Sequence, residues 1–249
     1  MWQPDGRLAV HWGAIIVTTA IVLGVLSSRP QAPDRPEDTQ QQAAPVSAPV
    51  CTDGPPVALT FDDGPSDEHS ARLADLLRRE DVPATFFMIG RSVHERPGLT
   101  RRLAKDGHRI HLHTYDHVDL TKRSDEEIRS QIRRSEQAFE RAGVSTGRVV
   151  RPPYGAVNPR VREVLRDMGY RTVLWTVDTN DWSEARTSDE IVRSVKRRLH
   201  PRASILLHDK SDSDATMQAM PRIIRVVRRQ GYCFGVIDDR GRVVRAPAG

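Results

Sequence analysis

Short apolar runs alternate with amphipathic stretches from residue 57 to the end of the chain. Seven runs have the length and flanking residues of buried strands, and six stretches between them repeat apolar residues at helical spacing. The predicted strands are 57–61, 84–89, 109–112, 148–151, 171–177, 203–207 and 232–237, and the predicted helices are 69–80, 97–106, 124–142, 158–168, 188–199 and 215–230. This alternation is typical of an α/β fold, in which helices pack outside a parallel sheet. About seven strands in one domain favour an incomplete barrel over an open, doubly wound sheet.

Several predicted helices carry recognisable end signals. Ser124 with Glu127, and Thr187 with Glu190, have the spacing of a capping box, which fixes the first turn of a helix. Three other helix ends are followed by a glycine, which readily adopts the left-handed conformation of a C-terminal cap: Gly143, Gly169 and Gly231.

The first 50 residues differ from the rest of the chain. Arg7 precedes an apolar stretch, 9–26, which is long for a signal peptide and barely sufficient for a membrane span. Residues 1–27 are therefore predicted to be a signal peptide or a membrane anchor. Residues 28–50 are rich in Pro, Gln, Ala and Ser, which predicts a disordered linker. In either case the domain formed by 51–249 lies outside the cytoplasm, membrane-anchored or secreted, near the cell wall.

The charge balance is modestly basic. The formal net charge is +5, and residues 51–249 contain 35 basic and 29 acidic side chains. Such a surplus suits an anionic envelope, a membrane face or nucleic acid, and it also suits ordinary solubility. Aromatic residues make up only 5% of the chain and form no basic, aromatic ribbon, so we expect no nucleic-acid partner. We expect a monomer.

The two cysteines lie at opposite ends of the predicted domain. Cys51 precedes the first strand and Cys233 lies in the last one. In an oxidising compartment this arrangement predicts a disulfide that ties the termini together. The alternative is two unpaired thiols, with Cys233 buried in its strand.

Polar residues of chemical interest follow five of the seven predicted strands. In parallel α/β folds the carboxyl ends of the strands share one rim, where catalytic groups gather. The residues at these ends are Asp62 and Asp63, His113 and His117, Arg151, the run from Asp178 to Trp182, and His208 with Asp209. The pattern predicts a metal-assisted hydrolase.

His113 and His117 have a spacing that can place two imidazoles on one metal ion, and Asp63 can add a carboxylate. Asp62 would then be left as a base, since adjacent residues at a strand tip point in different directions. The alternatives are two surface histidines and an aspartate turn onto Gly64. His108 and His111 are interpreted as structural or surface residues.

Two later motifs can complete a catalytic site. The rigid turn 151–155 offers Arg151 to orient a carboxylate, although it can equally be only a turn. His208 beside a carboxylate can act as a general acid, and alone it would be structural. Trp182 can stack on a sugar ring or cap the barrel.

Taken in order, five motifs resemble those of the polysaccharide deacetylases, the NodB-homology domain of carbohydrate esterase family four. They are Thr60-Phe61-Asp62-Asp63-Gly64-Pro65, His113-Thr114-Tyr115-Asp116-His117, Arg151-Pro152-Pro153-Tyr154-Gly155, Asp178-Thr179-Asn180-Asp181-Trp182 and Ile205-Leu206-Leu207-His208-Asp209. The resemblance covers residues 51 to about 240. It departs from the family pattern at His111-Leu112, where Gly-Asn is frequent, and at Asp116 and Val118, where Ser and Pro are common.

The resemblance implies a deformed (β/α) barrel and a divalent metal, zinc first and cobalt, nickel or iron as alternatives. By this resemblance, the metal ligands are Asp63, His113 and His117. Asp62 is the base, tethered by Arg151, and His208 is the acid, tuned by Asp181. The backbone N–H of Tyr154 donates to the oxyanion, and Trp182 and Leu206 border the acetyl pocket. The expected activity is deacetylation of N-acetylated glycans, peptidoglycan first and chitin-type oligosaccharides second. The alternatives are an O-acetyl esterase acting on a polysaccharide such as xylan, and a non-catalytic glycan-binding module.

Overall fold

The computed structural model describes residues 54–246. In this range the strands are β1 (Pro56–Asp62), β2 (Thr85–Met88), β3 (Arg109–Leu112), β4 (Val149–Val150), β5 (Arg171–Thr172), β6 (Val177–Asp178), β7 (Ser204–His208), β8 (Cys233–Ile237) and β9 (Val243–Arg245). The helices are α1 (Asp67–Arg79), α2 (Gly90–Glu95), α3 (Pro97–Lys105), α4 (Asp125–Ala142), α5 (Pro159–Asp167), α6 (Ser188–Arg198) and α7 (Asp214–Arg229), with 3₁₀ turns η1 (Leu120–Lys122) and η2 (Pro153–Gly155).

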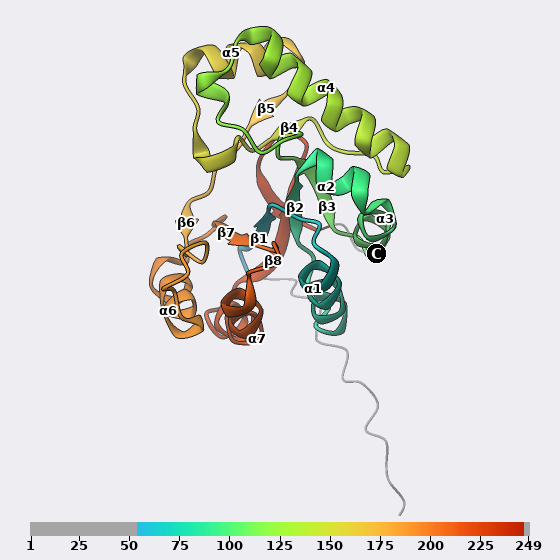
Figure 1. The fold of residues 1–249 in the computed structure, drawn as a ribbon. Coiled ribbons are helices and arrows are strands. Elements are labelled where there is room, and N and C mark those ends of the chain that lie inside the picture. Colours follow the sequence, from blue (N-terminus) through green and yellow to red (C-terminus); the bar gives the residue numbers. More distant parts are fainter. Residues whose placement is uncertain (1–53, 247–249) are drawn as a thin grey trace, which may run out of the picture. The chain divides into compact units, whose positions relative to one another are not determined.

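The strands form one curled sheet in the order β5-β4-β3-β2-β1-β7-β6, and neighbours along this path are parallel. Figure 1 shows the helices arranged around this sheet. β1 lies at its centre, and every residue from Val57 to Asp62 is buried, as expected for a strand covered on both faces. The predicted α/β fold with a deformed barrel is confirmed.

The predicted strand 171–177 is wrong in one respect, because it is two strands. β5 pairs with β4 at one edge of the sheet, and β6 pairs with β7 at the other. Residues 173–176 cross between the edges, where the N–H of Val173 donates to Val150 (3.0 Å) and that of Thr176 donates to Ser204 (2.9 Å). Their β-branched and aromatic residues suit a strand, but the choice of neighbour is a tertiary property that overrides this preference.

One α-helix and one strand were not predicted. α2 is separated from α3 only by Arg96, and Pro97 at the first position of α3 gives the second helix its own start. β9 returns antiparallel to β8 after a turn that ends at Gly241, whose φ is 74°. Both predicted capping boxes are confirmed, and Gly143, Gly169 and Gly231 all have positive φ.

Two of the clustered histidines belong to the interior. His108 is 6% exposed and His111 is fully buried, and burial lowers the pKa of each to about 4. His111 donates from Nε2 to the carbonyl of Ile237 (3.0 Å). Both imidazoles are therefore neutral packing groups, in line with their structural interpretation.

The N-terminal predictions lie outside the described residues. They concern the segment 1–27, the linker 28–50 and Cys51. Cys233 is buried at the start of β8, and its pairing with Cys51 stays a prediction. Within 54–246, none of the helices combines the length and the apolar character that a membrane crossing requires.

Candidate active site

The polar residues predicted at strand ends meet at one rim of the sheet. Asp62 ends β1 and His208 ends β7, and the two are register partners in that parallel pair. Among residues 54–246, seven non-glycine residues have positive φ, and five of them lie in the loops that follow β1, β3, β4 and β6 at this rim: Asp63, Thr114, His117, Tyr154 and Asn180. Left-handed backbone is costly for such residues and concentrates at functional sites.

Asp63, His113 and His117 converge on one point. Oδ1 of Asp63 lies 3.3 Å from Nε2 of His113 and 3.0 Å from Nε2 of His117. His113 donates from Nδ1 to the carbonyl of Arg151 (2.7 Å), which leaves its Nε2 lone pair facing Asp63. Oδ1 of Asp63 is buried and accepts no hydrogen bond. A buried oxygen without a donor, facing imidazole nitrogens, fits a cation held between them.

The chemistry of this donor set agrees with that fit. Burial raises the pKa of Asp63, but His113 and His117 lower it more, so that it lies well below its ordinary value. A carboxylate oxygen and two imidazole nitrogens, all within 4.8 Å of one another, suit a divalent transition metal with open positions.

Asp62 has a different partner. Arg151 is fully buried, and its Nη1 donates to Oδ1 of Asp62 (2.7 Å) and to Oγ1 of Thr60 (2.8 Å). The guanidinium also lies 3.9 Å from the centre of the Phe87 ring. Oδ2 of Asp62 lies 3.9 Å from Nε2 of His113, on the side of the metal ligands. One oxygen is therefore anchored, and the other faces the centre of the site.

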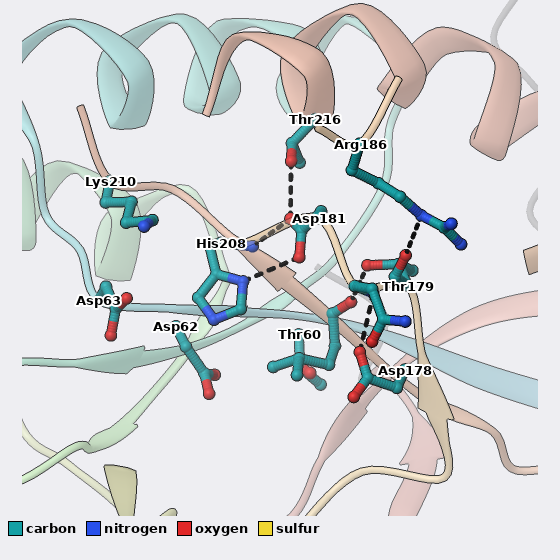
Figure 2. Close-up of polar contacts among 12 residues, drawn as sticks. Thr60, Asp62, Asp63, Asp178, Thr179, Asp181, Arg186, His208, Lys210 and Thr216 are labelled. Atoms are coloured by element: carbon teal, nitrogen blue, oxygen red, sulfur yellow. Dashed lines mark hydrogen bonds and ion pairs between the residues drawn. The ribbon is translucent and has the colours of Figure 1, made fainter. Parts of the chain in front are cut away.

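His208 approaches from the opposite side. Its Nδ1 lies 2.8 Å from Oδ1 of Asp181, while its backbone N–H (2.8 Å) and Oγ1 of Thr216 (2.6 Å) donate to Oδ2. Figure 2 shows the imidazole between Asp181 on one side and Asp62 and Asp63 on the other. Burial alone would lower the pKa of His208, but the hydrogen bond and charge of Asp181, with the charges of Asp62 and Asp63, raise it to about 9. The imidazole is therefore protonated near neutrality.

Two aromatic side chains flank the site. Tyr154 is 69% exposed and Trp182 is 55% exposed, and they are the exposed large hydrophobic residues of the described range. The Tyr154 ring meets His117 edge-on at 4.7 Å. Leu206 is buried but does not pack into the hydrophobic core, and it lies on the same face of β7 as His208 two residues later.

Sequence reasoning missed the role of Asp209. Its Oδ2 accepts from Oγ of Ser70 (2.6 Å), its carbonyl accepts from Oγ of Ser66 (2.6 Å), and its N–H donates to the carbonyl of Asp62 (3.1 Å). A Cβ on Gly64 would lie 2.3 Å from Oδ1 of Asp209. Asp209 thus fixes the turn that carries Asp62 and Asp63, and its position beside His208 was the only signal in the sequence.

Asp116 forms a second unpredicted network. Its carboxylate accepts from Arg91, from Arg134 (2.6 Å) and from Nε2 of Gln131 (2.9 Å). Oε1 of Gln131 accepts in turn from the backbone N–H groups of Tyr115 (3.0 Å) and Asp116 (2.8 Å). These bonds hold the loop that ends in the metal ligand His117.

Comparison with known proteins agrees with this site. The family model for polysaccharide deacetylase matches residues 50–173. Peptidoglycan-N-acetylglucosamine deacetylase PgdA of Listeria monocytogenes is 38% identical over 74% of this chain, and the chain spans only 38% of that relative's length. Peptidoglycan-N-acetylglucosamine deacetylase of Bacillus cereus is 35% identical over 74% of this chain and 86% of its own length.

A solved structure is similar over almost its whole length. The family 4 carbohydrate esterase from Streptomyces lividans, solved in complex with acetate, superposes with a TM-score of 0.73 and 36% identity over 78% of this chain and 98% of its own. Sequence, fold and the Asp-His-His cluster therefore lead to the same conclusion: the chain belongs to the polysaccharide deacetylases of carbohydrate esterase family 4.

Proposed function

We propose that the protein hydrolyses acetyl groups from N-acetylated glycans outside the cytoplasm, with peptidoglycan as the first substrate and chitin-type oligosaccharides as the second. The observation that carries the proposal is the division of partners between adjacent aspartates. Asp63 faces two imidazoles, whereas Asp62 is anchored by a buried arginine. A glycan-binding module has no need of that division. The predicted export segment and the named activities of the relatives support a cell-wall substrate.

Asp63, His113 and His117 would hold the metal, for which zinc is our first choice because the ligands are two imidazoles and one carboxylate. When bound, such an ion polarises an acetyl carbonyl and makes a neighbouring water more acidic.

The remaining residues handle the protons. Arg151 fixes the orientation of Asp62, whose Oδ2 accepts a proton from the water that attacks the acetyl carbon. The backbone N–H of Tyr154 is placed by the left-handed φ of 61° in η2 and would donate to the developing oxyanion. His208, protonated and oriented by Asp181, gives its Nε2 proton to the departing sugar amine. The products are acetate and a glucosamine unit. Trp182 and Leu206 would border the acetyl methyl.

The test is acetate release from purified peptidoglycan by the full chain, with chelator and after metal add-back. Asp62→Asn provides the matched variant, because an amide oxygen can still accept from Arg151 and the metal ligands are untouched. We expect a loss of about 10²–10⁴-fold in kcat with metal content unchanged. Full activity of the metal-loaded variant would contradict the mechanism. Faster release from acetylated xylan than from peptidoglycan would favour the O-acetyl esterase instead.

A further inference from the structure

The positive charge of the described domain is unevenly placed. Residues 54–246 contain 35 basic and 28 acidic side chains, a net charge of +7. Five of the basic residues line one groove of about 310 Å³ between α6 and α7, which lie side by side (Figure 1). The lining consists of Arg193, Lys196, Arg222, Arg225 and Arg229 with Val192 and Val226, and contains no acidic residue. Five of the 35 basic side chains therefore lie together in what we call the α6–α7 groove.

Most of these side chains lack a carboxylate partner. Arg222 pairs with Asp189. Within the described range, the other four have no carboxylate within the 4.0 Å of an ion pair: Arg193, Lys196, Arg225 and Arg229. On α4, Arg133 pairs with Glu126 and Arg134 with Asp116, whereas the exposed Arg141 has no such partner among the described residues. The groove differs in that its unpaired like charges lie together, and their mutual repulsion would be relieved by an external anion.

The spacing of the charges suits an extended ligand. The basic residues of α7 that line the groove fall at positions 222, 225 and 229, which places them along one helix face over about 10 Å. Arg193 and Lys196 are three apart on α6 and extend the second wall. Arginine binds phosphate in a bidentate manner and lysine binds it as a point charge, so four guanidinium groups and one ammonium group along two helices match a chain with repeated phosphates better than a single anion.

The composition of the groove argues against a membrane-inserting helix and against single-stranded nucleic acid. An inserting helix buries apolar groups in the bilayer, and single-stranded nucleic acid stacks its bases on aromatic groups. In residues 54–246 the exposed large hydrophobic side chains are Tyr154 and Trp182, and both belong to the catalytic rim. The groove is also concave, whereas a membrane surface is flat on this scale. We propose that the α6–α7 groove binds a linear phosphodiester polymer, such as a polyol phosphate chain, and so holds the enzyme on an anionic envelope. No residue of the catalytic site lines it, so the proposal does not depend on the proposed activity.

The test is binding of fluorescently labelled poly(glycerol phosphate) to the purified full chain, measured by anisotropy. The groove variant carries Arg193→Gln, Lys196→Gln, Arg225→Gln and Arg229→Gln. A matched control removes four exposed charges elsewhere that also lack a carboxylate within 4.0 Å: Arg79→Gln, Arg141→Gln, Arg162→Gln and Arg240→Gln. We expect the groove variant to bind at least about tenfold more weakly and with a shallower salt dependence, because fewer counterions are released. The control should lose less than about threefold.

Equal losses in both variants would overturn the proposal, because net charge alone would then explain binding. Tighter binding of the wild type to vesicles of anionic phospholipid than to the polymer would overturn it in favour of a membrane. Acetate release from soluble N-acetylglucosamine oligomers should be the same in wild type and both variants. If the four substitutions together lower the Tm, two double variants, one on each helix, provide the same comparison. Failure to bind with intact acetate release would refute the groove and leave the proposed activity standing.

Discussion

Two histidine–aspartate contacts of nearly equal length lie at the same rim, His117 with Asp63 at 3.0 Å and His208 with Asp181 at 2.8 Å. Their surroundings differ. The carboxylate of Asp181 meets the imidazole Nδ1, a backbone N–H and a hydroxyl, whereas Oδ1 of Asp63 accepts no hydrogen bond. The number of donors around the carboxylate thus distinguishes the two pairs. The carboxylate that accepts several hydrogen bonds holds a proton on its histidine, and the one whose oxygen accepts none is free to bind a cation.

The largest effect is expected where the cation would be held. His117→Ala removes one of three ligands and should abolish acetate release, a greater loss than the about 10–100-fold seen when outer-shell partners are removed. Elemental analysis should show loss of bound metal, while the circular dichroism spectrum stays native. A variant that kept both its metal and its activity would show that the contact with Asp63 is only structural.

The second-largest effect is expected on the proton that His208 would donate. As the proposed general acid, His208 acts in its protonated form, so wild-type activity should fall as the pH rises through about 9. Asp181→Asn removes the charge that raises this pKa and leaves burial, which lowers it. The alkaline limb of kcat should therefore move down by at least about one pH unit. Thr216→Val keeps the charge of Asp181 but removes one donor, and should leave the limb almost in place. An unchanged limb in Asp181→Asn would exclude His208 as the acid.

A smaller effect is expected from the turn that joins the two halves of the site. Gly64→Ala forces a Cβ against Asp209, which should displace Asp62 and Asp63 and cost about 1–3 kcal/mol of unfolding free energy. Gly98→Ala is the matched control, because its Cβ meets only the end of an arginine at 3.9 Å inside a helix. Urea denaturation of both variants measures the difference. Equal stability of the two would show that the turn can shift freely.

The smallest effect is expected at Asp116. Asp116→Asn weakens the pairs with the exposed Arg91 and Arg134, each worth about 0–1 kcal/mol, but it also loosens the loop before His117. We expect a Tm lowered by a few degrees and a loss of less than about tenfold in kcat/KM. Glu126→Gln breaks a more exposed pair with Arg133 away from this loop and should change only the Tm. Equal kcat/KM in both variants would remove Asp116 from the positioning of the metal ligands.

The sequence was sufficient for the rim because the strand ends of a parallel sheet coincide. Asp62, His113 and Arg151 could be brought together from their positions after apolar runs alone. The sequence could not indicate which strands pair side by side in the sheet. The crossing at 173–176 and the hairpin of β8 with β9 depend on which strand is the neighbour, and local residue preference does not encode that choice.

Supporting contacts were equally hidden. Ser70 and Asp209 are 139 positions apart, and Asp181 and Thr216 are 35 apart, so neither pair leaves a local pattern. The ligand set was visible in the sequence because the reaction restricts residue types. The groups that orient it were not, because many polar side chains can supply the same hydrogen bond.

The buried Arg151 has an evolutionary consequence. Its guanidinium is fully enclosed and its charge is balanced by Asp62. Loss of that carboxylate to an apolar residue would strand a cation in the interior at a cost of about 3–5 kcal/mol, a large part of the stability of an ordinary domain. A lineage that abandons catalysis therefore cannot discard the base by a single apolar substitution without risking the fold. We expect inactive descendants to keep an acceptor at position 62, or to have replaced the arginine first.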